Sequence, residues 1–158
     1  MTNSIRLRAV INSDLPVFFE QQLDTDANYM AAFTAKDPTD EAAFQSHWSK
    51  ILSDKTIQLR TILSDDQIAG HVVCHRWFGD PEISYWIARD FWGRGVATKA
   101  LYAFLNELID RPLHARAAKD NLASIRVLEK CGFEHCDEDK GYSNARGEVV
   151  EEFLLILH

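Results

Sequence analysis

Two glycines, Gly93 and Gly95, stand in a short loop, residues 92–98, between an expected strand and an expected helix. The first backbone N–H groups of a helix have no partner inside it, and the helix dipole adds partial positive charge at that end. Glycines let an anion approach such a backbone closely and permit positive φ angles. The loop is therefore a candidate phosphate site, to which Arg94 could add charge and Thr98 a hydroxyl.

The alternative for this loop is a plain strand–turn–helix connection, in which the glycines serve only the turn. The loop does not match two common nucleotide-binding motifs. A P-loop would need Gly-Lys followed by Ser or Thr, and the dinucleotide fingerprint G-x-G-x-x-G would need glycine where Thr98 stands.

Hydrophobic patterning predicts the elements that would hold this loop. Strands are expected over residues 5–10, 56–63, 67–76, 82–88, 113–118, 133–136 and 149–157. Helices are expected over residues 15–23, 39–52, 95–109 and 121–131. Residues 24–38 and 137–147 are predicted to be irregular. A strand meander in the middle of this order indicates an α+β (mixed α/β) domain, not a doubly wound parallel sheet.

Two details of this pattern concern the candidate site. Asn121 is predicted to cap the last helix, with Gly132 just past its end. Tyr29, Met30 and Phe33 lie in the irregular segment 24–38, where they either cover the core or line a substrate mouth. Large apolar side chains are usually buried, which favours core cover.

Composition limits the class of protein. The chain has 158 residues, which fits one domain over residues 1–158, and 46% of them are hydrophobic. The net charge of −7 argues against nucleic acid as a partner and weakly favours amine or cationic substrates. Three cysteines without a C-x-x-C spacing indicate a reducing compartment. With no secretory signal or membrane-length apolar run, a cytoplasmic location away from the membrane is expected.

The segment 83–101, ISYWIARDFWGRGVATKAL, resembles motif A of the GNAT N-acetyltransferase superfamily, [QR]-x-x-G-x-[GA]. Gly95 and Ala97 match its small positions, whereas Trp92 stands where Gln or Arg is usual. Tyr85-Trp86 followed by Trp-Gly-Arg-Gly is similar to the branch related to ribosomal-protein-alanine acetyltransferases. Residues 120–133, DNLASIRVLEKCGF, resemble motif B of that branch. The likeness is strong over residues 82–133 and vague before them.

The resemblance implies a GNAT-type fold, with a twisted mixed sheet of about six to seven strands flanked by about four helices. It also implies acetyl-coenzyme A (acetyl-CoA) as co-substrate, and no metal. In this family a bulge splays the strand before motif A from the next parallel strand. The pantetheine arm lies in that gap, and the loop after it holds the pyrophosphate. The implied cofactor-binding residues are Trp86, Ile87, Ala88, Trp92, Gly93, Arg94, Gly95, Val96, Ala97, Thr98, Asn121 and Ser124.

The family reaction is direct attack of a neutral amine on the thioester, which needs a base for the amine proton and a donor for the leaving thiolate. Many members use a tyrosine as that donor, but its position here is Leu128. Ser124 is the better candidate, because the matching serine lies near the thiol in the resembling branch. Asn121 matches a residue that contacts pantetheine. Plain roles at a helix start are the alternatives for Asn121 and Ser124.

Glu82 is the first choice for the base, and Ser84 shares its strand face by two-residue alternation, whereas Tyr85 points to the other face. A surface carboxylate at a strand end is the alternative for Glu82. His71 and His75 share a face of the neighbouring strand and are candidates for a base or a metal pair. A missing third ligand argues against metal. Partly buried structural histidines are favoured, because histidine is often intermediate in burial. Among the cysteines, Cys131 at a helix C-terminus is expected to be an inert thiol.

These observations predict an N-acetyltransferase acting on a primary amine, either a small molecule or a protein N-terminus. A non-catalytic acyl-CoA-binding sensor or interaction module is the alternative, and a protein for another phosphate ligand is a third reading. The acceptor, the base and the use of other acyl-CoAs are left open, as is a homodimer.

Overall fold

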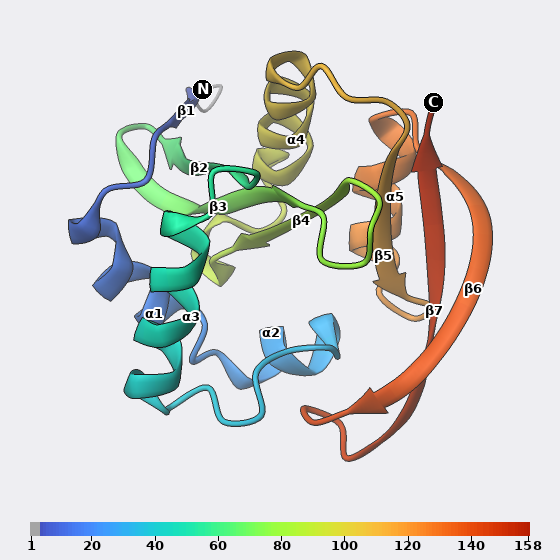
Figure 1. Ribbon diagram of the computed structural model, residues 1–158, viewed down its shortest axis with the longest axis horizontal. Coiled ribbons are helices and arrows are strands. Elements are labelled where there is room, and N and C mark those ends of the chain that lie inside the picture. Colours follow the sequence, from blue (N-terminus) through green and yellow to red (C-terminus); the bar gives the residue numbers. More distant parts are fainter. Residues whose placement is uncertain (1–3) are drawn as a thin grey trace.

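A seven-stranded sheet forms the centre of the computed structural model, which describes residues 4–158 (Figure 1). The strand order is β1-β2-β3-β4-β5-β7-β6, and only β4 and β5 are parallel neighbours. This mixed sheet confirms the predicted α+β class. The strands are β1 (Ile5–Arg8), β2 (Gln58–Ser64), β3 (Gln67–His75), β4 (Glu82–Ile87), β5 (Leu113–Ala118), β6 (Glu134–Ser143) and β7 (Glu148–Leu157).

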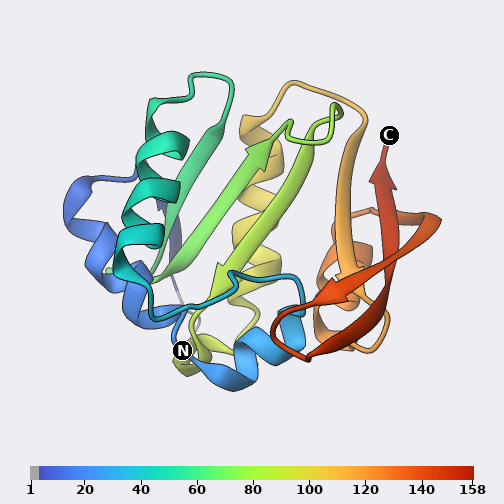
Figure 2. The ribbon, with the colours of Figure 1, turned by 60° about the horizontal axis from the view of Figure 1, so that its bottom comes forward.

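Helices cover both faces of the sheet. The α-helices are α1 (Leu15–Gln21), α2 (Thr25–Ala31), α3 (Glu41–Ser53), α4 (Val96–Glu107) and α5 (Leu122–Lys130), and 3-10 turns η1 (Asn12–Asp14) and η2 (Arg89–Phe91) precede α1 and α4. Figure 2 shows α1 and α3 on one face and α4 and α5 on the other.

The main core lies between the sheet and the helices α4 and α5. Phe104 and Leu101 of α4 are each 1% exposed and pack against sheet residues such as Leu113 and Leu155. Burying an aromatic or leucine side chain contributes about 1.5–3 kcal/mol each. This packing fixes α4, and with it the loop that precedes α4, against the sheet.

A second core fills the opposite face. Phe18 of α1 and Trp48 of α3 pack with their ring centroids 5.1 Å apart. Beside this cluster the Asp14 carboxylate is 1% exposed and accepts hydrogen bonds from Arg8 and from the Thr61 hydroxyl. Because a buried charge needs partners, this network ties β1, η1 and β2 together.

Strands β4 and β5 pair over only two positions, Glu82 with His114 and Ile83 with Ala115, and then diverge (Figure 2). The expected bulge in β4 is wrong as far as its pairing with β3 goes, because that register runs unbroken from His75–Glu82 to Gly70–Ile87. The irregularity lies one strand away, between β2 and β3 at Ile62/Leu63. The splay therefore comes from β5 leaving β4.

Two segments predicted to be irregular are regular in part, whereas residues 32–38 and 144–147 are irregular as predicted. Residues 25–31 form α2, because the Asp24 carboxylate accepts from the Asp26 and Ala27 N–H groups as an N-cap. Most of 137–147 belongs to β6, which pairs with β7 from Glu134 to Ser143. Neither polar stretch has a clear hydrophobic period, so local capping and cross-strand pairing decided both.

Candidate functional site

The loop before α4 is open to solvent at the helix start. Gly93 and Gly95 both have φ of 74°, and a Cβ added to either would meet nothing within 4 Å. Within residues 4–158 no side chain caps this helix end, and Trp92, Gly93, Arg94 and Gly95 are all exposed. Backbone N–H groups at the start of α4, from Val96 to Thr98, are thus available to an anion. The glycines are required by positive φ and also keep the approach clear.

The end of β4 is held on both sides. The Ala88 N–H donates to the Ala69 carbonyl at 2.8 Å, and the Trp92 indole N–H donates to the Ile87 carbonyl at 2.7 Å. In an antiparallel ladder, alternate residues turn their backbone groups to the same neighbour, so Trp86 and Ala88 face β3 while Ile87 faces the gap. On this stretch it is therefore the backbone of Ile87 that points toward the gap, and the binding of pantetheine by Trp86, Ile87 and Ala88 stays a prediction.

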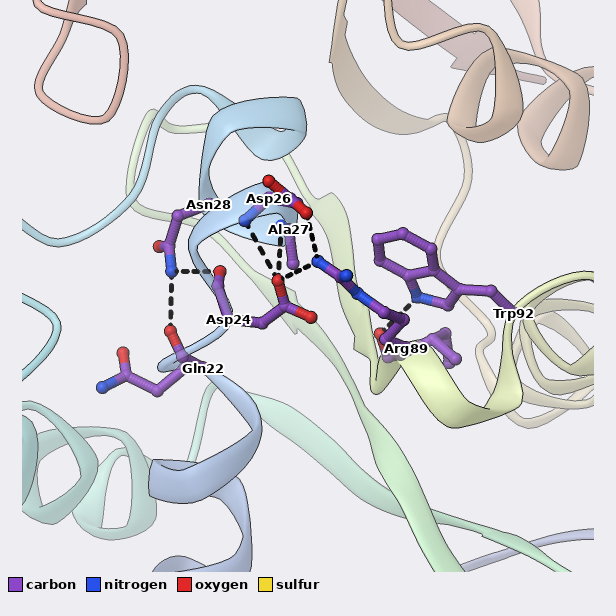
Figure 3. Close-up of polar contacts among 8 residues, drawn as sticks. Gln22, Asp24, Asp26, Ala27, Asn28, Arg89 and Trp92 are labelled. Carbon is purple, nitrogen blue, oxygen red and sulfur yellow. Dashed lines mark hydrogen bonds and ion pairs between the residues drawn. The ribbon is translucent and has the colours of Figure 1, made fainter.

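Helix α2 lies across the ends of β4 and β5. At its start, Arg89 of η2 forms ion pairs with Asp24 and, at 2.8 Å, with Asp26, as Figure 3 shows. Burial alone would raise the pKa of Asp24, but the N–H of Ala27 and the Arg89 guanidinium hold it below its usual value. These contacts connect the start of α2 to η2, the turn that precedes the glycine loop before α4.

The other end of α2 is tied to the start of α5 and, through Arg146, to the turn between β6 and β7. The Asn121 side-chain N–H donates to the Met30 carbonyl at 3.3 Å, and its oxygen accepts from the Ser124 N–H. The cap predicted for Asn121 is confirmed, and its contact with pantetheine stays a prediction. Tyr29 and Phe33 are 49% and 41% exposed, so core cover was wrong for these two side chains. They lie instead on the surface, where the Arg146 guanidinium covers the Tyr29 ring at 4.4 Å and Phe33 lies beside Gly141 of β6.

Sequence reasoning missed the partner of Ser124. The Tyr85 hydroxyl lies 2.9 Å from Ser124 Oγ, and burial raises the pKa of Tyr85 to about 12 despite this hydrogen bond. Alternation placed Tyr85 opposite Glu82 and Ser84 correctly, but no sequence signal links β4 to the first turn of α5. The structure therefore puts Ser124 on the α4–α5 side of the sheet and Glu82 on the opposite side.

Glu82 is not a surface carboxylate. It is 9% exposed, accepts from Arg116 Nε at 3.1 Å and lies 3.8 Å from His75 Nε2. Arg116 also bonds to Glu152 at 3.0 Å and to Asp139 at 3.3 Å. The carboxylates outnumber the one guanidinium, so this corner is negative. Ser84 lies on the same strand face and is exposed.

A pocket of about 250 Å³ opens above this ion-pair cluster. It lies where β4 and β5 are still paired, next to the point at which they diverge. Its lining combines aromatic, acidic and histidine side chains with one arginine. The lining residues are Phe78, Asp80, Glu82, His114, Ala115, Arg116, Cys136, Asp137 and Leu154.

The remaining candidates have structural surroundings. Burial, together with the charge of His47, lowers the pKa of His71 to about 4, and its ring packs between Phe18 and Trp48. Burial also lowers the pKa of His75, which stacks on Trp77. Over residues 4–158 no three His, Cys, Asp or Glu side chains come together as a candidate metal site.

Leu128 of α5 and Cys131, the C-cap residue of that helix, also have structural surroundings. Leu128 is 1% exposed, so the site of the family tyrosine is filled by core packing. Burial raises the pKa of the Cys131 thiol, whose Sγ donates to the Thr98 carbonyl at 3.7 Å. A raised pKa keeps a thiol protonated and unreactive.

In the part of the chain that the structure describes, no helix is long and apolar enough to cross a membrane.

Residues 4–134 match the Acetyltransferase (GNAT) domain, and the chain therefore belongs to the GNAT acetyltransferase family. It is 27% identical over 84 residues to an uncharacterized N-acetyltransferase p20 from Bacillus licheniformis. That match covers 50% of this chain and 47% of the relative, so the chain aligns with about half the length of this curated relative.

Solved structures share the whole fold at low identity. The spermidine N-acetyltransferase from Vibrio cholerae, in complex with CoA and spermine, has a TM-score of 0.79 at 16% identity, covering 97% of this chain and 94% of the other. The ribosomal-protein-alanine N-acetyltransferase from Brucella melitensis has a TM-score of 0.79 at 20% identity, covering 96% and 98%. Mycobacterium smegmatis RimJ, in complex with CoA-disulfide, has a TM-score of 0.78 at 22% identity, covering 97% and 81%. The predicted GNAT-type fold is confirmed.

Proposed function

We propose that this chain transfers the acetyl group of acetyl-CoA to a primary amine by direct attack through a tetrahedral intermediate. The observation that carries the proposal is the open, uncapped start of α4 directly after the splay between β4 and β5. A diphosphate fits there because unpaired N–H groups and the helix dipole favour negative charge at that end. Family membership and the CoA complexes among the structural neighbours support CoA as the carrier.

The residues present fit acetyl-CoA along one path. Backbone N–H groups around Gly95 and Val96 would hold the pyrophosphate, with Arg94 exposed beside them. Pantetheine would run into the gap along Ile87. This path brings the thioester into the gap. Tyr85 and Ser124 lie there on one side of the sheet, and Ser84 lies on the other side. Holding both substrates there supplies rate through proximity and orientation.

Glu82 is the proposed base and takes the amine proton through a water molecule. Its carboxylate lies in the pocket wall next to the gap, where it accepts a hydrogen bond from Arg116 Nε. Ser84 lies farther along the same strand face, where its exposed hydroxyl can orient that water. Ser124 is the proposed donor to the leaving thiolate. The C–N bond forms, the C–S bond breaks, and the electron pair moves to sulfur.

The acceptor class follows from the same pocket. The acidic lining favours an amine that reaches the gap past Asp80 and Glu82. Relatives that act on a polyamine or on a ribosomal protein are compatible with either a small-molecule amine or a protein N-terminus. A cytoplasmic location and a homodimer remain predictions from the sequence.

A non-catalytic acyl-CoA sensor is the alternative, and two observations favour it. Leu128 fills the position of the family tyrosine, and Glu82 is engaged by Arg116. The sensor would bind acetyl-CoA in the same groove without turnover.

The deciding experiment measures thiol release from acetyl-CoA with the purified chain and a panel of amines, alongside calorimetric binding of acetyl-CoA. Turnover with at least one amine, above hydrolysis, supports the enzyme. Binding without turnover on any amine supports the sensor. If nucleoside diphosphates displace acetyl-CoA as well as CoA does, the loop serves another phosphate ligand and the proposal fails.

A further inference from the structure

A hydrogen bond joins β4 to α5 on the α4–α5 side of the gap between β4 and β5. Tyr85 belongs to β4 beyond the last β4–β5 pair, and Ser124 belongs to the first turn of α5, which follows β5. Their hydroxyl oxygens are 2.9 Å apart. This contact therefore connects β4 to α5 where the strands themselves no longer pair.

The direction of that hydrogen bond decides what Ser124 can do. A serine hydroxyl carries one hydrogen, and in a helix it often spends this hydrogen on the carbonyl of the preceding turn. Within residues 4–158 the Tyr85 hydroxyl is the hydrogen-bond partner of Ser124 Oγ. A tyrosine phenol is protonated at physiological pH, and burial raises the pKa of Tyr85 further, to about 12. Tyr85 can therefore donate to Ser124 and leave the serine hydrogen unused.

We propose that Tyr85 is a positioning residue that directs the Ser124 hydroxyl hydrogen toward the sulfur of the leaving coenzyme A. The proposal rests on the function proposed above, in which Ser124 supports the thiolate. As the C–S bond breaks, the electron pair goes to sulfur, and Ser124 donates a hydrogen bond to it while Tyr85 donates to Ser124. No proton leaves either hydroxyl, because the amine proton goes to Glu82 through water.

Two donors in series are stronger than one, since each hydrogen bond polarises the next in a low-dielectric site. The pair would take the place of the family tyrosine, whose position is filled here by Leu128. It also gives a role to the hydroxyl of Tyr85, whose ring packs against the core cluster that contains Ile83 and Ile87.

The first test is a double-mutant cycle. Tyr85→Phe removes one oxygen atom and should lower kcat about tenfold with the KM for acetyl-CoA unchanged, the effect of losing a hydrogen bond made in the transition state. Ser124→Ala should lower kcat by at least as much. The double variant should be no slower than Ser124→Ala within about twofold, since Tyr85 acts only through Ser124. Tyr102→Phe is the matched control, because that tyrosine is 64% exposed on α4.

The second test does not depend on turnover. The thiol of bound coenzyme A is titrated by the ultraviolet absorbance of its thiolate, with free coenzyme A as reference. The wild-type chain should lower the thiol pKa, and Tyr85→Phe and Ser124→Ala should each return it toward the free value. Tyr102→Phe should match wild type.

The outcomes separate the two proposals. A Tyr85→Phe chain with wild-type kcat and thiol pKa would overturn the role of Tyr85 while leaving the acetyltransferase intact. Additive effects of the two substitutions would overturn it as well. If no amine is acetylated, the proposed function fails, and the thiol titration alone still decides whether Tyr85 acts through Ser124.

Discussion

Gly95 shows at the scale of one residue how the backbone makes a site. It stands at the N-cap of α4 with φ of 74°, a conformation that L side chains rarely adopt, and its surroundings are open. A polar side chain would normally cap such a helix start. The glycine leaves the helix N–H groups to an external anion.

Two substitutions of Gly95 should therefore distinguish the effect of charge on acetyl-CoA affinity from the effect of backbone strain. Gly95→Glu and Gly95→Gln share the same backbone strain, about 1 kcal/mol. Glu places a negative charge at the proposed pyrophosphate position, so its affinity for acetyl-CoA should be at least ~10-fold weaker than that of Gln by calorimetry. Equal affinities of the Glu variant and the wild-type chain would remove the phosphate assignment from this loop.

Ser124 and Glu82 show that the chemistry of a residue depends on the partners that hold it. Both were chosen from sequence as chemical groups, yet each is held by a partner distant in sequence: Tyr85 for Ser124, and Arg116 for Glu82. Their chemistry depends on these partners, because hydrogen bonds and neighbouring charges set which proton is held and where it points.

At the scale of elements, the close approach of β3 to β4 positions the proposed pantetheine strand. A Cβ added to Gly70 of β3 would lie 1.8 Å from the Trp86 carbonyl oxygen, which no adjustment of a side-chain tip can relieve. Gly70 thus lets the backbone of β4 lie closer than another residue would permit.

Gly70→Ala should push β4 toward the gap. We expect a loss of about 1–3 kcal/mol in the free energy of unfolding, as for an overpacked core, together with weaker acetyl-CoA binding. Gly141→Ala is the control, since its added Cβ would make an ordinary 3.5 Å contact with Phe33. Denaturant unfolding and calorimetry measure the two effects. Wild-type stability and affinity in Gly70→Ala would show that β4 does not depend on this approach.

At the scale of the whole molecule, negative charge gathers near the proposed acceptor route. The net charge is −7, and Asp80, Glu82 and Asp137 line the pocket in which Arg116 is already paired with carboxylates. Long-range attraction would therefore raise the local concentration of cations.

A positively charged acceptor should be preferred. A diamine should show a lower KM than an amino acid of equal chain length, and its KM should rise as salt increases from low to physiological ionic strength. Asp80→Asn should raise the diamine KM and leave that of an uncharged-tail amine unchanged. Steady-state thiol release measures all three quantities. Equal KM values for both acceptors, insensitive to salt, would contradict an electrostatic route.

Sequence patterning by itself determined most of the helices and strands. The alternation of 113–118 and the helical face of Leu101 and Phe104 predicted elements that the structure contains, and the two glycines before α4 indicated the anion site that we propose. These features are local, because strand period, helix period and positive φ are encoded within a few residues.

Only the tertiary structure decided how the sides of the gap are joined. Contacts between segments far apart in sequence decide whether β4 leaves β5 after Ile83 and whether α2 spans their ends through Arg89. They also decide whether Tyr85 meets Ser124. Such contacts depend on the closing of long loops and on packing against a shared core, and neither leaves a periodic trace in the chain.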